Sequence, residues 1–380
     1  MLNVAARANI PPFHVMDVLS AANARQRAQG DVVSLAAGQP SAAAPRAVLD
    51  RAAESLHGYL GYTEQLGIPE LREAIAHHYD QRYALDVDPS DVVATTGSSG
   101  GFLLAFLAAF DAGDRVALAR PGYPAYRNIL RTLGCEVVEL PCGPETRFQP
   151  TVDMLARAGR LDGLIIASPA NPTGTVLPTG EFAAIAGWCA DHDVQLVSDE
   201  IYHGISYLAD PPASAWQFSR EAIVVNSFSK YFAMTGWRLG WLLVPRRLLR
   251  AVDCLTGNFT LCPPTLAQHA ATAAFQYAEL DAHVDHYRVN RDLLVTGLAK
   301  LGIDRVAPVD GAFYAYADVS HLTTDTMSWC QRLLAETGVA IVPGVDFDPA
   351  LGTRFVRFSF AGPTQDVEAA LERLGEWLTP

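Results

Sequence analysis

The chain has 380 residues and a mass of 41.0 kDa, and 50% of its residues are hydrophobic against 18% charged. These values exclude general disorder and allow two packed domains. A formal net charge of −13 argues against nucleic acid or an anionic membrane as a partner. Because no run approaches the ~20 apolar residues that cross a bilayer, and Met1–Arg7 lacks the apolar core of a secretion signal, we expect a cytoplasmic protein.

The cysteines and histidines give no metal-ligand pattern. The six cysteines lie far apart without a C-x-x-C pair, which predicts small core thiols. His283 and His286 stand near Asp281 and Asp285, but no Cys or Glu completes a ligand cage, so we interpret this stretch as a solvated helix face. We expect no metal site.

Short β-branched runs alternate with amphipathic stretches along the first two thirds of the chain, after an initial predicted helix at Val15–Gln29. The predicted strands are Asp91–Thr95, Arg115–Ala119, Glu136–Leu140, Gly163–Ala167, Val194–Ser198, Ala222–Val225 and Leu239–Val244. The helices among them are Gly101–Phe110, Ala125–Leu133, Val152–Ala158 and Glu181–Asp191. This alternation predicts an α/β fold with a mostly parallel sheet covered on both faces, in which ligands bind beyond the carboxyl ends of the strands.

The pattern changes after the sheet. Thr265–Gln276 and Asp281–Leu301 are predicted long helices, and later segments alternate strand and helix. The later strands are Gly311–Ala317 and Arg354–Phe360, and the later helices are Met327–Thr337 and Thr364–Trp377. We predict a large domain over residues 45–285 and a smaller α+β domain from residues 1–44 plus 286–380, with an N-terminal arm. A ligand cleft is expected between them.

Three motifs follow predicted strands and are each ambiguous alone. Gly97-Ser98-Ser99-Gly100-Gly101 opens an apolar helix, where free N–H groups suit a phosphate, although a plain turn fits equally well. It is neither G-x-G-x-x-G nor a Walker P-loop. Asn171–Gly174 is typical of a turn with a possible cis bond. Asp199 is either a structural cap or the partner of a bound cation.

Lys230 follows another strand, in the motif Ser227-Phe228-Ser229-Lys230. A lone lysine is usually a surface residue. This one is flanked by Phe228, Tyr231 and Phe232, and apolar surroundings lower the pKa of an amine and make it a better nucleophile. Ser227 and Arg238 could meet a phosphate beside it. A nucleophilic lysine, an aspartate for a pyridinium nitrogen and a phosphate cradle together indicate pyridoxal 5′-phosphate (PLP).

The chain resembles the class I PLP-dependent aminotransferases of fold type I, related to bacterial aspartate aminotransferases. The most specific motifs are Ser227–Lys230 and Thr235–Gly240, and the similarity runs from Gly38 to Arg357. Supporting motifs are Gly67–Arg72, Pro121–Tyr123, Asn171–Gly174, Asp199–Tyr202 and Val356–Ser359. The resemblance implies a mostly parallel seven-stranded sheet in a large domain with a smaller α+β domain.

The resemblance also implies a role for each site residue. Lys230 binds the cofactor covalently and carries the Cα proton, and Asp199 pairs with the ring nitrogen. Tyr202 and Asn171 hydrogen-bond the ring 3-oxygen, and Tyr123 stacks on the ring. The implied phosphate ligands are Ser98, Ser99, Ser227 and Arg238, and the implied substrate ligands are Arg357, Asn171 and Gly38. Tyr62 is similar to a tyrosine that reaches the neighbouring subunit's phosphate, which implies a homodimer with shared sites; the arm around Pro11–Phe13 is also expected to lie on the partner.

The substrate prediction depends on a departure from that family. Dicarboxylate-specific relatives carry a lysine where this chain has Ser99, and the stretch Thr256–Tyr287 contains no Arg or Lys. A buried distal carboxylate without a cation is costly. We therefore expect a ping-pong aminotransferase that favours a neutral L-amino donor, with aspartate possible and 2-oxoglutarate or pyruvate as the 2-oxo acid.

Alternative interpretations use the same cofactor or none. A carbon–sulfur β-lyase or a decarboxylase on the same scaffold would share every cofactor motif. A non-catalytic PLP-binding regulator would need a basic helix-turn-helix segment, which the residues before Gly38 do not supply. A Rossmann dehydrogenase lacks its glycine spacing here and explains neither Lys230 nor Arg357.

Overall fold

Seven strands form the central sheet of the computed structural model, which describes residues 3–379. The strand order is β2-β8-β7-β6-β5-β3-β4, and only β8 runs antiparallel to its neighbours within this sheet. The strands are β2 (Val92–Thr95), β3 (Arg115–Arg120), β4 (Glu136–Pro141), β5 (Gly163–Ala167), β6 (Gln195–Asp199), β7 (Ile223–Ser227) and β8 (Gly240–Leu243). The predicted α/β fold with a mostly parallel seven-stranded sheet is confirmed.

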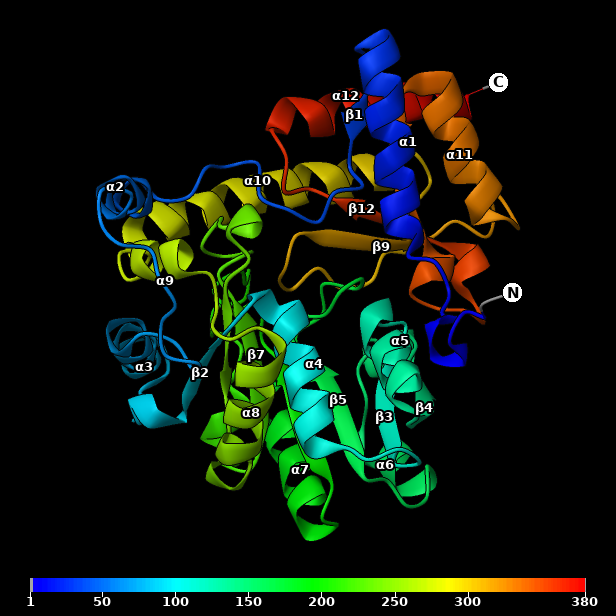
Figure 1. Ribbon diagram of the computed structural model, residues 1–380. Helices are drawn as coiled ribbons and strands as arrows, with labels where there is room; N and C mark the ends of the chain where they lie inside the picture. The colour runs from blue at the N-terminus through cyan, green and yellow to red at the C-terminus, as the bar shows by residue number, and fades with distance from the viewer. Residues whose placement is uncertain (1–2, 380) are drawn as a thin grey trace.

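Helices cover both faces of this sheet, so successive strand residues enter different cores. In β5, Leu164 and Ile166 belong to one buried cluster and Ile165 to another. The second cluster lies under α4 and α8, which stand in front of the strands in Figure 1. The helices around the sheet are α2 (Arg46–Ser55), α3 (Pro69–Tyr83), α4 (Gly97–Ala109), α5 (Pro124–Leu133), α6 (Val152–Arg157), α7 (Thr179–Asp191), α8 (Arg246–Phe259) and α9 (Thr265–Ala271).

A second group of elements lies above the sheet in Figure 1. It contains the antiparallel sheet β11-β12-β9 and a parallel pair in which Val33 of β1 lies opposite Val339 of β10. This pair joins the N-terminal residues to the C-terminal region. The elements are α1 (His14–Gln29), β1 (Val33–Ser34), α10 (Tyr277–Lys300), β9 (Tyr314–Asp318), α11 (Thr326–Thr337), β10 (Val339–Ala340), β11 (Val342–Pro343), β12 (Phe355–Ser359) and α12 (Thr364–Leu378). The boundary at residue 285 stays a prediction, since α10 crosses that position as one helix.

Several element boundaries differ from the predicted ones. Helix α4 begins at Gly97, four residues early, because Gly97 takes a positive φ of 72° that turns the chain directly from β2 into the helix. Helix α9 ends at Ala271, and α10 begins at Tyr277. Helices α2, α3 and α8 are not among the predicted elements.

Two further findings concern the cysteines and the membrane. All six cysteines are free thiols, and four are buried; Cys262 is half-buried and Cys254 is exposed, so the core prediction is wrong for Cys254. Among residues 3–379, no helix combines the length and apolarity needed to cross a bilayer.

Candidate active site

The loops after β2, β3, β5, β6 and β7 meet at the carboxyl edge of the central sheet. One cavity there is lined by most of the predicted site residues: Gly38, Ser98, Ser99, Tyr123, Asn171, Asp199, Tyr202, Lys230, Arg238 and Arg357. Parallel strands bring their carboxyl ends to one edge, so motifs far apart in the sequence become neighbours. The site therefore lies where the strand–helix pattern predicts it.

Lys230 lies in the loop after β7 and directs its amine into this cavity. Its Nζ donates a hydrogen bond to the carbonyl oxygen of Gly38 at 2.6 Å and lies 5.8 Å from the ring centroid of Tyr202. Burial lowers the pKa of Lys230 to about 8; the positive charges of Arg357 and Arg238 contribute, and Asp199 opposes them. About a tenth of this amine is therefore neutral at pH 7 and about half at pH 8, and the neutral form is the one that acts as a nucleophile or base.

Asp199 is the last residue of β6, and its side chain is 4% exposed. The hydroxyl of Tyr126 donates to Oδ2, and the backbone N–H of Ile201 donates to Oδ1 at 3.0 Å. Burial raises the pKa of Asp199 to about 6, while these two donors and Lys230 favour the charged form. The result is a carboxylate that is mostly ionised at pH 7 on the wall of the cavity.

The start of α4 forms a cradle for an anion. Among the described residues no side chain caps this helix, and its first turn contains no acidic residue. A Cβ at Gly97 would lie 2.5 Å from Nη2 of Arg238, so only glycine lets the guanidinium lie against this turn. Arg238 is exposed and donates to the carbonyl oxygen of Thr235 at 3.1 Å. A helix start and an arginine together suit a phosphate group.

Arg357 on β12 is held rigidly at the opposite side of the cavity and is 2% exposed. Its Nη1 donates to Oδ1 of Asn171 at 2.8 Å, and its Nη2 donates to the carbonyl oxygen of Ala36 at 2.9 Å. The guanidinium lies 4.3 Å from the ring centroid of Tyr314 and 4.8 Å from that of Phe347. Its Nε has no hydrogen-bond partner among the described residues, which leaves a donor for a carboxylate ligand.

Two predicted cofactor residues do not line the cavity of their own chain. Ser227 lies beneath the loop: its Oγ accepts from the N–H of Ser229 at 3.0 Å and donates to the carbonyl oxygen of Leu239 at 3.3 Å. Tyr62 is 83% exposed and is not among the residues that line this cavity. By contrast Phe13 of the N-terminal arm lines the cavity and packs edge-to-face on Tyr123, with ring centroids 5.9 Å apart.

Some residues of the site were not predicted. Tyr126, Ser229, Thr235 and Tyr314 all line the cavity. Tyr314 shares a hydrogen bond of 2.7 Å between its hydroxyl and that of Tyr202. Ser229 stands inside the motif that contains Lys230, so its position was a usable signal. Tyr126 and Tyr314 have the pattern of ordinary core tyrosines, and nothing local marks them.

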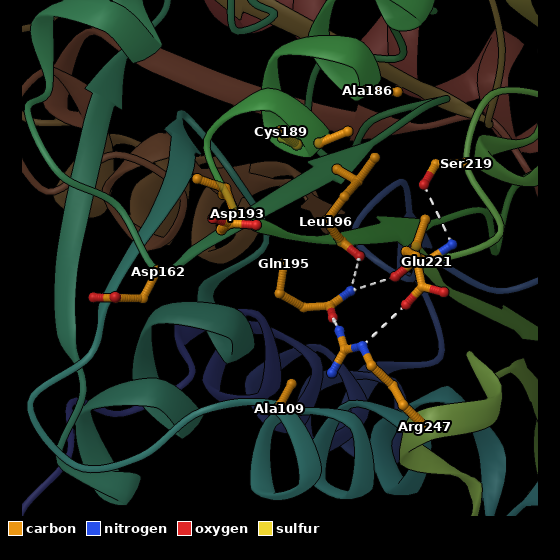
Figure 2. A pocket seen from close by; sticks show the side chains of 13 residues that line it. Ala109, Asp162, Ala186, Cys189, Asp193, Gln195, Leu196, Ser219, Glu221 and Arg247 are labelled. Atoms are coloured by element: carbon orange, nitrogen blue, oxygen red, sulfur yellow. Dashed lines mark hydrogen bonds and ion pairs between the residues drawn. The ribbon is translucent and has the colours of Figure 1, made fainter.

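A second hollow lies at the amino ends of β5, β6 and β7, on the far edge of the sheet (Figure 2). Its polar groups bind one another. Nε of Arg247 donates to Glu221 at 3.0 Å, and the Gln195 amide donates to two backbone carbonyl oxygens at 2.9 Å. Ligands of parallel sheets bind at the other edge, so we assign no role to this hollow.

Comparison with known proteins places this geometry in a family. The family model "Aminotransferase class I and II" matches residues 30–374. A valine–pyruvate aminotransferase of Mycobacterium tuberculosis is 64% identical over 381 residues, which cover 99% of this chain and 98% of that protein. An aspartate/prephenate aminotransferase of Thermus thermophilus is 37% identical over 93% of this chain and 92% of its own length. A crystal structure of an aminotransferase from Mycobacterium tuberculosis superposes with a TM-score of 0.98 at 64% identity, covering 100% of this chain and 99% of that one.

The fold and the lysine–aspartate–arginine site define an α/β enzyme of the transaminase class. The chain belongs to the aminotransferase class I and II family and is a class I PLP-dependent aminotransferase.

Proposed function

We propose that this enzyme transfers the amino group between a neutral L-amino acid and a 2-oxo acid, such as pyruvate or 2-oxoglutarate, in a ping-pong cycle. The observation that carries the proposal is the distribution of charge: among the described residues that line the cavity, the cations are Lys230, Arg238 and Arg357. Each serves the cofactor or the α-carboxylate, so a distal carboxylate would be buried unpaired. The name of the Mycobacterium relative, valine–pyruvate aminotransferase, agrees with this proposal.

Part of the cavity lining is apolar, which supports the same substrate class. Helix α1 and the residue before it contribute Phe13, Val15, Met16 and Leu19 to the cavity. Hydrocarbon side chains gain free energy from such a wall in proportion to the apolar area they bury, and a charged side chain does not. A branched aliphatic amino acid therefore suits this cavity better than aspartate.

The residues present fit PLP. Lys230 would hold the cofactor aldehyde, Asp199 would hold a proton at the ring nitrogen, and the start of α4 with Arg238 would bind the phosphate. When bound, PLP supplies the electron sink for bond cleavage at Cα. Tyr123 would stack against the ring. Tyr202 and Asn171 would lie near the 3-oxygen, with the Asn171 amide nitrogen as donor because its oxygen already accepts from Arg357. Ser227 would act through Ser229, whose N–H it binds.

The chain's own residues would bind and orient the substrate. Arg357, fixed by Asn171 and Ala36, would clamp the α-carboxylate and thereby direct the Cα–H bond toward Lys230. The neutral amine of Lys230 would then accept the Cα proton at Nζ and later return it. In this structure the carbonyl of Gly38 accepts a hydrogen bond from this amine and keeps it in the cavity.

We also propose a homodimer in which Tyr62 reaches the partner's site. Segments 56–62 and 259–261 carry exposed apolar side chains, including Tyr59 at 94% and Phe259 at 56%. The two segments lie close together, because the N–H of Thr63 donates to Sγ of Cys262 at 3.5 Å and Thr265 Oγ1 donates to the carbonyl oxygen of Gly61 at 2.7 Å. An apolar patch of this kind favours burial against a second copy. Sedimentation of the wild type and of Tyr59→Glu tests this: the variant should shift to monomer, and a monomeric wild type would contradict the homodimer.

The substrate proposal is tested by a donor–acceptor panel on purified holoenzyme. Valine, alanine, phenylalanine and aspartate are compared with pyruvate and 2-oxoglutarate as acceptors. Neutral donors should exceed aspartate, and Ser99→Lys should raise activity with aspartate, whereas Ser90→Lys on the exposed surface should not. A wild type that prefers aspartate would overturn the proposal. Release of ammonia, pyruvate and sulfide from cysteine, an amino acid with a thiol leaving group on Cβ, without an acceptor would instead indicate a β-lyase.

A further inference from the structure

Helix α1, which forms the apolar wall of the active site, is capped by a residue more than 300 positions away. The backbone N–H groups of His14 and Val15 donate to Oδ1 and Oδ2 of Asp346 at 3.2 and 2.9 Å. The residue at the N-cap position of α1 is Phe13, whose side chain cannot accept a hydrogen bond. Asp346 is 3% exposed and ends the short 3₁₀ turn η6 (Gly344–Asp346). The start of α1 is thus fixed by a buried carboxylate from the C-terminal region.

The turn that carries Asp346 also contacts the arginine proposed to bind the substrate carboxylate. The next residue, Phe347, places its ring centroid 4.8 Å from the Arg357 guanidinium. The backbone of the turn is itself held: Arg127 donates to the carbonyl oxygen of Asp346 at 3.2 Å, and the Gly122 N–H donates to that of Phe347 at 3.1 Å. One rigid turn therefore contacts both the carboxylate anchor and the start of the apolar wall.

The distance between Arg357 and the apolar residues of α1 limits the size of the substrate side chain that fits between them. Val15 and Leu19 on α1 line the same cavity as Arg357 and Lys230. Once a substrate's α-carboxylate is bound at Arg357, its side chain can contact the wall only if α1 keeps its position. Pocket contacts to one extra methylene typically discriminate by about 10-fold or more, so a small displacement of α1 changes selectivity.

We propose that Asp346 is a positioning residue that sets the preference for branched aliphatic over small amino donors, by holding the start of α1 at a fixed distance from Arg357. This inference rests on the proposed function, because it assumes that neutral amino acids are the donors. Asp346 touches neither the substrate nor the cofactor in this assignment. Its effect passes through the two hydrogen bonds to the α1 backbone and the position of the hydrophobic residues that follow.

The test compares Asp346→Ala and Asp346→Asn with a control on the same helix. Asp17→Ala is the control, because Asp17 is an exposed acid in the first turn of α1 that contacts His14 and not the η6 turn. Single-turnover half-reactions of the PLP-loaded enzyme with valine or alanine need no acceptor. We expect Asp346→Ala to lower kcat/KM for valine about 10-fold, mainly through KM, and that for alanine less than about 2-fold. For Asp346→Asn, kcat/KM for valine should lie between the values for Asp346→Ala and the wild type. For Asp17→Ala, kcat/KM for both donors should match the wild type.

Hydrogen–deuterium exchange gives a readout that does not depend on activity. Amides 14–19 should exchange faster in Asp346→Ala than in the wild type, and they should exchange at the wild-type rate in Asp17→Ala. Leu19→Ala should reproduce the valine-specific loss and add little in the double variant with Asp346→Ala, since both remove the same wall. Asp346→Asn, which conserves the side-chain size and one acceptor oxygen, keeps the test decisive if Asp346→Ala folds poorly.

The outcomes separate the two proposals. A wild type that prefers aspartate to valine, alanine and phenylalanine contradicts the proposed function itself. The role of Asp346 alone is overturned if the wild type is active with valine and Asp346→Ala shows faster exchange of the α1 amides but the same ratio of kcat/KM for valine to kcat/KM for alanine. Equal losses for both donors would likewise refute selectivity and reduce Asp346 to a stabilising residue.

Discussion

Replacing Tyr126 with phenylalanine isolates how the protein keeps Asp199 ionised. The substitution removes the hydroxyl that donates to Oδ2 of Asp199 and leaves the ring in place. The ring contacts remain, with centroids 5.0 Å from Phe102 and 5.3 Å from Tyr123. Asp199 keeps the single backbone donor from Ile201 at 3.0 Å. The charged carboxylate loses about half of its hydrogen bonding, and the fold loses little packing.

The expected size follows from the strength of that bond. A hydrogen bond to a charged group contributes about 1.5–3 kcal/mol, or about 1–2 pKa units. Because the lost bond favoured the charged form, the pKa of Asp199 should rise from about 6 to about 7–8. At pH 7 the ionised fraction would then fall from roughly 90% to roughly 10–50%. Binding of PLP to the apoprotein, which needs this carboxylate in its charged form, should weaken about 2- to 9-fold at pH 7 and recover by about pH 9.

The assay is the PLP affinity of the apoprotein relative to the wild type, from about pH 6 to 9.5, with kcat/KM for the preferred amino donor measured alongside. Tyr316→Phe is the matched control: Tyr316 is buried, lies outside the cavity lining, and its hydroxyl has no partner among the described residues. The control should leave the profile unchanged. A loss in Tyr126→Phe that is equal at every pH, or no loss at pH 7, would refute the role assigned to this hydrogen bond.

Three further predictions concern the amine, the glycine beside it and the arginine. Burial holds the pKa of Lys230 near 8 in the folded protein, below its ordinary 10.5. Between about pH 8 and pH 10.5 the unfolded chain therefore binds more protons than the folded protein, and the free energy of unfolding rises with pH in this range. The apoprotein of Lys230→Met should therefore be more stable than the wild type by about 1–3 kcal/mol at pH 7 in urea unfolding. This difference in unfolding free energy should shrink as the pH rises toward 10.5. A difference that does not change with pH would contradict the cost of burying the charged amine. Gly38→Ala would bring a Cβ onto the Tyr314 hydroxyl and should cost about 1–3 kcal/mol of stability and lower activity. The control Gly180→Ala, whose Cβ meets nothing within 4 Å, should leave the melting temperature unchanged or raise it. Equal melting temperatures for the two variants would argue against the clash. Arg357→Lys loses the planar fork and should raise KM about 10-fold or more in steady-state kinetics; an unchanged KM would show that the carboxylate binds elsewhere.

Much of the fold and the residue types of the site could be predicted from the sequence because both depend on local sequence patterns. Seven β-branched runs gave strands whose bounds differ from the structure by at most two residues, as at β7, since burial on both faces requires continuous apolar runs. The motifs after these strands contain Lys230 and Asp199, and the parallel arrangement brings their loops to one edge. Residue type and strand position were sufficient for this part.

Only the tertiary structure decides the contacts that tune and limit the site. The donor to Asp199 is Tyr126, 73 positions away, and the acceptor for Lys230 is the Gly38 carbonyl, 192 positions away. Asp346 meets α1 across 331 and 332 positions. Periodicity reports which face of an element is buried, whereas such pairs depend on how the elements pack, and packing is a property of the whole chain.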